Sequence, residues 1–284
     1  MITAEDSVAG FPLVSVEIGL SGSTAYFLPS LTGAQSMGCV ICGADGRVFV
    51  IDGGWRDDAF LIEELVRRLL PDLPTVTLWL ISHGHMDHIG AISEIMRRGR
   101  LAVQAVCHAL YPPELWEKFD TRTDKDMAAY TALYHSFPSQ DVEAILPRVG
   151  DIFKFGTLAF EVMRTPDPSV TANFGNNSSV VYRMTAAGKS ILFLGDLGEE
   201  CGDVFMRAAG DRLKCDAVVM AHHGQGGVKE SFYRVVSPKA AIWPAPGWLW
   251  NNERSGLCIM ETRKWMSALG VENYVTKDGI LAVR

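Results

Sequence analysis

Apolar and polar positions alternate along the chain with two different periods. Short runs rich in β-branched and aromatic residues, bounded by glycine and serine, predict strands at 14–20, 24–28, 37–42 and 48–51, the last two forming a hairpin. An apolar face with helical spacing follows, between Asp57 or Asp58 as N-cap and Pro71 as helix breaker. The continuous apolar run at 76–81 is typical of a strand buried on both faces.

The same alternation continues to the end of the chain. It predicts helices at 87–98, 199–209, 230–236 and 258–269, a mostly helical segment at 112–146, and strands at 101–106, 158–163, 179–184, 190–194, 217–221 and 240–243. No linker, low-complexity tract or repeat separates these segments, so we expect a single domain over 1–284, built of two halves at roughly 1–150 and 151–284. Strands in both halves with helices between them indicate an α/β fold whose sheets are covered by helices.

Composition narrows the class of protein. The 26 basic and 33 acidic residues give a net charge of −7, and 48% of the residues are hydrophobic, which excludes a disordered chain and disfavours nonspecific nucleic-acid binding. No apolar run approaches the roughly 18–20 residues that cross a bilayer, and acidic residues stand where a secretory signal would carry basic ones. We therefore expect a cytoplasmic protein that does not enter a membrane.

The six cysteines are too sparse for a disulfide scaffold. Cys39 and Cys42 match a CxxC pattern, but they lie inside a predicted strand, and this favours buried core cysteines over a redox or zinc pair.

The strongest chemical signal is a cluster of metal-ligand side chains where a buried strand ends and a helix begins. His83, His85, Asp87 and His88 fall within six residues. Imidazole and carboxylate are the ligands of a borderline divalent cation, and Gly84 allows the loop to fold tightly. Two further polar residues, Asp196 and His222, also follow apolar strands, as expected of a site built on strand ends.

The HxHxDH pattern resembles the metal-binding motif of the metallo-β-lactamase superfamily. The resemblance extends from Asp52 to about Pro246 and includes the Asp-Gly turn at Asp52, the Leu-Gly-Asp ending at Asp196 and the His-His-Gly beginning at His222. More narrowly, the Asn-Asn-Ser-Ser segment at Asn176, together with the last two motifs, is similar to the hydrolase domain of bacterial DNA-uptake (competence) channel proteins and to related phosphodiesterases, including phosphocholine esterases.

This resemblance implies a four-layer αββα fold, in which two mixed β-sheets lie between helices. It also implies two divalent metal ions, with zinc expected and manganese as an alternative. By position, His83 and His85 would hold the first metal, Asp87, His88 and His222 the second, and Asp196 would bridge them, while Asp52 would brace the histidine loop without touching metal.

The chain departs from the family at one ligand. The family supplies a third histidine to the first metal, and Asn176 and Asn177 stand at the expected place. An amide oxygen is a harder and weaker ligand, which favours manganese or magnesium more than an all-histidine site would. The two asparagines could contact metal or substrate, or could be ordinary turn residues.

Other assignments remain open at the level of sequence. We prefer His222 as ligand because it leaves the strand directly, with His223 nearby as a candidate proton donor. His108 and His135 are expected at the surface or in packing. The tryptophans of the Pro- and Gly-broken segment 243–250, Trp248 among them, could line a substrate cleft or plug the core. Arg254 and Lys229 could meet a phosphate, although surface charge is the simpler interpretation.

The resulting functional hypothesis is hydrolysis. Two cations lower the pKa of a shared water from 15.7 toward about 7, which yields hydroxide at neutral pH, and Asp87 could serve as a base beside it. The narrower resemblance favours a phosphodiester substrate, and the charge of −7 favours a small molecule or an exposed polymer end over long nucleic acid. The alternatives are hydrolysis of a carboxylic ester, lactone or thioester, and a metal-dependent sensor or scaffold without turnover.

Overall fold

Two large mixed sheets form the centre of the computed structural model, which describes residues 7–122, 126–137 and 141–284. The first sheet has the order β1 (Ser7–Val8), β2 (Phe11–Val16), β18 (Ile280–Val283), β3 (Thr24–Phe27), β4 (Gly38–Cys42), β5 (Val48–Asp52), β7 (Leu78–Leu80), β9 (Ala105–Cys107) and β10 (Glu143–Ile145). The second has the order β11 (Ile152–Phe155), β12 (Leu158–Arg164), β13 (Val181–Ala186), β14 (Lys189–Phe193), β15 (Ala217–Val219), β16 (Ala240–Trp243) and β17 (Glu272–Val275).

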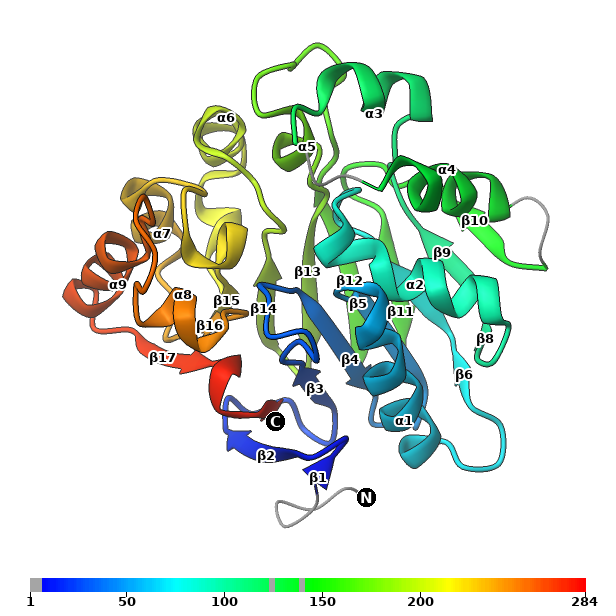
Figure 1. Cartoon of the computed structure of the whole chain (residues 1–284). Coiled ribbons are helices and arrows are strands. Elements are labelled where there is room, and N and C mark those ends of the chain that lie inside the picture. Colours follow the sequence, from blue (N-terminus) through cyan, green and yellow to red (C-terminus); the bar gives the residue numbers. More distant parts are fainter. Residues whose placement is uncertain (1–6, 123–125, 138–140) are drawn as a thin grey trace.

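Helices cover the outer face of each sheet (Figure 1). The first sheet carries α1 (Ala59–Leu69) and α2 (Met86–Arg98), and the second carries α6 (Glu199–Ala209), α7 (Glu230–Val236) and α9 (Ile259–Ala268). The helix α4 (Met127–Ser136) packs on α2, and α3 (Pro113–Phe119) packs on α4 beyond the end of the sheets (Figure 1). Two short helices, α5 (Phe174–Asn177) and α8 (Gly247–Trp250), lie in connecting segments, and β6 (Thr75–Val76) pairs with β8 (Ala102–Val103) in a small separate ladder. The chain therefore has the four-layer α/β arrangement.

Three apolar clusters fill the spaces between the four layers. The period of two along each central strand sends neighbouring side chains to opposite clusters: Val40 and Val50 face the helices, whereas Ile41 and Ile51 face the second sheet. Between the sheets the rings of Phe27 and Phe193 stack with centroids 5.7 Å apart. The two sheets are thus fixed against each other, which fixes the relative positions of the loops at their edges.

Many predicted elements are confirmed. The hairpin of β4 and β5 and the helix α2 are present, and α6, α7 and β16 have the predicted bounds. Cys39 is buried and Cys42 partly buried on β4, and neither forms a disulfide. Within the described residues, no helix is both long and apolar enough to cross a membrane.

Other predictions need correction. The run at 76–81 divides into β6 and β7, and the run at 101–106 into β8 and β9. The segment expected to be mostly helical contains β10, a strand of three largely exposed residues that pairs in parallel with β9 at the edge of the sheet. Such an edge strand lacks the apolar pattern that identifies strands in a sequence. The strand β18 belongs to the first sheet although it ends the chain, so the division near residue 150 is not complete.

The strands that carry the candidate ligands end at one edge. β5 runs parallel to β7 in the first sheet, and β14 runs parallel to β15 in the second. Because parallel strands present their carboxyl ends on the same side, the loops after these strands meet where the two sheets face each other.

Candidate metal centre

The histidine loop connects β7 to α2. Met86 is the first residue of α2, so Asp87 and His88 lie in its first turn while His83 and His85 precede it. At Gly84 a Cβ atom would lie 2.5 Å from Cε2 of Tyr130 and 3.1 Å from the ring of Trp116. Only glycine therefore fits at this position. The loop packs against the rings of Tyr130 and Trp116, which we call the aromatic floor.

A first set of donor atoms comes from His83, His85 and Asp196. Nε2 of His83 lies 3.0 Å from Nδ1 of His85 and 3.7 Å from Oδ2 of Asp196. All three side chains are buried. Two imidazole nitrogens of the histidine loop and one carboxylate oxygen of Asp196, which follows β14, thus face a common point.

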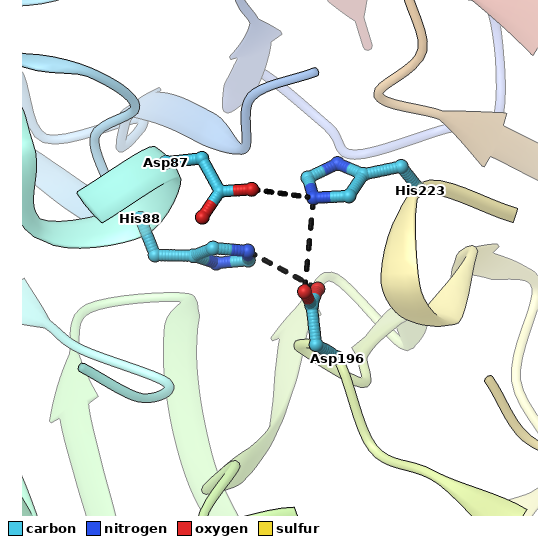
Figure 2. Close-up of side chains that lie close together, drawn as sticks. All are labelled: Asp87, His88, Asp196 and His223. Atoms are coloured by element: carbon cyan, nitrogen blue, oxygen red, sulfur yellow. Dashed lines mark ion pairs between the residues drawn. The ribbon is translucent and has the colours of Figure 1, made fainter. Parts of the chain in front are cut away.

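A second set comes from Asp87, His88, Asp196 and His223, whose side chains point toward one another in Figure 2. Nε2 of His88 lies 3.1 Å from Oδ1 of Asp196, and Nε2 of His223 lies 3.3 Å from Oδ2 of Asp87 and 3.8 Å from Oδ2 of Asp196. These four residues are buried as well. Asp196 belongs to both sets and lies between them.

The donor atoms suit divalent cations. Ligand bonds of 2.0–2.1 Å in a tetrahedron place neighbouring donors about 3.3 Å apart, and the distances above run from 3.0 to 3.8 Å. Among the described side chains, Oδ1 of Asp87, Nε2 of His88, Oδ2 of Asp196 and Nε2 of His223 are buried without a hydrogen-bond partner. A buried donor or acceptor without a hydrogen-bond partner lowers the stability of the fold, and a bound metal would satisfy these four atoms.

Asp52 sets the ring orientation of two histidines. It accepts hydrogen bonds from the backbone N–H of Ser82 at 2.7 Å, from Oγ of Ser82 at 2.8 Å and from Nδ1 of His88 at 2.8 Å. Oγ of Ser82 in turn lies 3.0 Å from Nδ1 of His83. With their Nδ1 atoms held in this way, His83 and His88 both present Nε2 to the centre. The structure thus places Asp52 behind the ligands, as the family resemblance implies.

The rings of His223 and His85 are held by other partners. Nδ1 of His223 lies 3.0 Å from the carbonyl oxygen of Pro244, and Nε2 of His85 lies 3.5 Å from Oδ1 of Asp120. Each of the four inward-facing histidines therefore has a partner on the nitrogen that points away from the centre. Such partners fix the tautomer of a metal-binding imidazole.

His222 differs from these four histidines. Its side chain is 22% exposed, its Nε2 lies 3.8 Å from Oδ2 of Asp196, and its Nδ1 has no hydrogen-bond partner among the described residues. Both His222 and His223 have left-handed backbone conformations, with φ of 49° and 56°, and this turn directs His223 inward. The geometry therefore puts His223 in the donor set and His222 at its margin, which reverses the preference drawn from the sequence.

Asn176 and Asn177 differ in their hydrogen bonds. Asn177 uses its whole amide: Nδ2 donates to the carbonyl of Ala172 and to Glu200, and Oδ1 accepts from the N–H of Gly198. Oδ1 of Asn176 is buried and has no hydrogen-bond partner among the described residues. Asn177 is therefore a structural residue, and Asn176 is the one with an oxygen available.

Electrostatics keep the carboxylates ionised. Burial by itself raises the pKa of Asp196, but the charges of His88, His223 and other histidines outweigh it and hold that pKa well below its ordinary value. For Asp87, burial is likewise outweighed by the close approach of His223 and the charge of His88, so its pKa is lowered. Burial lowers the pKa of His83 well below its usual value, which leaves a neutral imidazole that can bind metal.

The tryptophan segment packs mainly as a structural plug. Trp243 is fully buried on β16, and the ring of Trp250 meets it edge-on at 5.4 Å. Trp248 donates from Nε1 to the carbonyl of Gly33, and Arg254 stacks over its ring at 3.7 Å. Trp248 is absent from the residues that line the two small cavities next to the donor atoms. It therefore supports the loop that leads to the site.

The other candidates lie away from the centre. Lys229 pairs with Asp203 at 2.6 Å, as expected of a surface charge. His135 is exposed, and the ring of His108 packs against Phe137 with centroids 4.6 Å apart. The expectation of surface and packing histidines is confirmed.

Sequence reasoning missed several residues at the centre. Gln35 donates from Nε2 to Oδ2 of Asp87 at 3.3 Å, and Gln225 donates to Gln35 at 2.7 Å. Nη1 of Arg122 lies 3.6 Å from Oδ1 of Asp87. These residues and Asp120 come from loops without a recognisable motif, so only the fold could reveal them.

Comparisons with known proteins agree with this fold. The family model described as metallo-beta-lactamase superfamily matches residues 33–242, more than half of the chain. The metallo-beta-lactamase fold protein YhfI from Bacillus subtilis superposes with a TM-score of 0.55 at 12% identity, over 92% of this chain and 99% of that one. Unliganded yeast PDE1 superposes with a TM-score of 0.51 at 10% identity, over 92% and 97%. No curated protein matches the sequence.

Proposed function

Because the chain belongs to the metallo-beta-lactamase superfamily, we propose that it is a binuclear metal-dependent hydrolase that acts on phosphodiesters. The observation that carries the proposal is the pair of buried donor sets that share Asp196. Two adjacent cation sites are the arrangement used for in-line displacement at phosphorus. Zinc is the expected metal, and manganese is the alternative.

The ligand assignment follows the geometry. His83, His85 and Asp196 would hold the first metal, and Asp87, His88, Asp196 and His223 the second. Asn176 follows Gly175, whose backbone approaches His85, and its buried oxygen without a hydrogen-bond partner is our candidate for a further ligand of the first set. Bound divalent ions supply Lewis-acid chemistry and make water nucleophilic at neutral pH.

Asp87 and Arg122 are the side chains that would act on water and on the substrate. Asp87 is oriented by Gln35 and His223, and from this position it can accept a proton from an attacking water. The guanidinium of Arg122 lies 3.6 Å from Oδ1 of Asp87 and places a positive charge beside the second donor set. A cation there attracts an anionic substrate and supports a phosphodiester over a neutral acyl compound. His223 faces inward, so it is assigned as a ligand and not as a proton donor.

The proposed substrate is a small or polymer-end phosphodiester, and the proposed location is the cytoplasm. The six free cysteines suit a reducing compartment.

The experiment is turnover of bis-p-nitrophenyl phosphate and of p-nitrophenyl acetate by apo protein reloaded separately with zinc, manganese and magnesium. We expect metal-dependent cleavage of the phosphodiester that is abolished in Asp196→Ala and retained in His135→Ala, which changes an exposed histidine outside both sets. Cleavage of the acyl ester alone would replace the proposal with an acyl hydrolase. Two bound metals without turnover of either compound would favour a sensor or scaffold.

A further inference from the structure

We propose that Asp120 is the positioning residue that orients His85 toward the first metal, an inference that rests on the metal-binding part of the proposed function. Oδ1 of Asp120 lies 3.5 Å from Nε2 of His85, and both side chains are buried. The opposite ring nitrogen, Nδ1, is the one that lies 3.0 Å from Nε2 of His83. A carboxylate on Nε2 therefore fixes the tautomer that leaves Nδ1 free for metal.

The pair is enclosed on its other sides. The indole of Trp116 meets the ring of His85 edge-on, with centroids 5.4 Å apart. The backbone N–H of Arg122 donates to Oδ1 of Asp120 at 3.3 Å, which holds the carboxylate in place. His85 therefore has few alternative ring orientations while Asp120 is present.

Gly175, in the second half of the chain, leaves room for the contact between His85 and Asp120. A Cβ atom on Gly175 would lie 2.3 Å from Nε2 of His85 and 3.1 Å from Oδ1 of Asp120. Any larger residue would enter the space between the imidazole and the carboxylate. The short helix α5 thus approaches this pair with the one residue that leaves their contact intact.

Asp120 acts on the smaller of the two donor sets. The first set contains three His or acidic residues and the second contains four. A ligand lost or rotated in the smaller set removes a larger share of its binding energy. A partner that fixes the ring and raises its basicity is worth about 10–100-fold in metal affinity at such sites.

The test is metal binding by Asp120→Asn, Asp120→Ala and Gly175→Ala, measured by competition with a chromophoric chelator and by elemental analysis. Cobalt(II) absorption during stepwise loading reports the two sites separately, and none of these measurements needs a substrate. We expect metal affinity at the first site, formed by His83, His85 and Asp196, to fall about 10–100-fold. The loss should be larger for alanine than for asparagine, which keeps an acceptor oxygen, while the second site is unchanged.

Asp126→Asn is the matched control, because Asp126 lines the small cavity beside His85 but pairs with Arg56 and caps α4. It should bind both metals as the unmodified chain does. Wild-type affinity at both sites in Asp120→Asn and Gly175→Ala would overturn the proposal. Equal loss at both sites together with a lower melting temperature would also overturn it, since that result indicates a general structural role. Absence of phosphodiesterase activity would leave these readouts untouched.

Discussion

Replacing Asp52 should weaken both metal sites at once. Asp52 ends β5 and is almost fully buried, and its carboxylate contacts His88 directly and His83 through the hydroxyl of Ser82. These two histidines belong to different donor sets. A single side chain therefore holds one ligand of each metal, in contrast to Asp120, which contacts a ligand of the first metal only.

The magnitude follows from the hydrogen bonds. In Asp52→Asn the amide keeps the left-handed backbone (φ 54°), which asparagine tolerates, but its NH₂ group would face the Nδ1–H of His88. Loss of such a partner costs about 10–100-fold in metal affinity, or about 1.4–2.8 kcal/mol for each site. Asp52→Ala also leaves the N–H of Ser82 and Nδ1–H of His88 buried without an acceptor, at about 1–3 kcal/mol each.

The assay is chelator competition for both equivalents of metal, together with urea unfolding of the apo protein. Asp58→Asn serves as the matched control: Asp58 is equally buried and accepts from the N–H of Leu31 at 2.7 Å and of Trp55 at 2.9 Å, but it lies in neither donor set. It should lower stability while largely sparing metal affinity. If Asp52→Asn bound both metals as tightly as the unmodified chain, or lost only one, the shared role of Asp52 would be refuted.

Three further outcomes are expected. His223→Ala should lose one metal equivalent by elemental analysis, whereas His222→Ala should retain two, and the opposite result would restore the assignment made from the sequence. Gly84→Ala should overpack the aromatic floor, costing about 1–3 kcal/mol in urea unfolding and lowering metal content; unchanged unfolding would contradict the packing. Burial lowers the pKa of His108 to about 4, below its unfolded value of about 6.5, and Nδ1 accepts from the N–H of Leu110. Its contribution to stability is therefore complete above pH about 6.5 and is lost as the pH falls toward 4. His108→Asn should shrink the drop in unfolding free energy between pH 7 and 4.5 by about 2–3 kcal/mol, and an unchanged drop would argue against this origin.

Local patterns in the sequence were sufficient to predict the layered fold and most residues of the candidate metal centre. The period of two in β4 and β5 and the helical period in α2 and α6 report which face of each element is buried, because burial acts on every residue of a regular element. The histidine loop and Asp196 were recognisable because each directly follows an apolar strand, and strand ends are placed by the sheet.

Tertiary structure decided what local patterns do not encode. The choice of His223 over His222 depends on two consecutive left-handed residues and on the carbonyl of Pro244, which is distant in sequence. An edge strand such as β10 forms by pairing with the neighbouring strand of the sheet, and its own residues show little of the apolar pattern that identifies a strand in a sequence. Asp120 reaches His85 only because α3 and α5 converge on the histidine loop. A sequence displays residue types and their spacing, so it determined the candidate ligands that share a motif, whereas contacts between separate loops exist only once the two sheets have packed together.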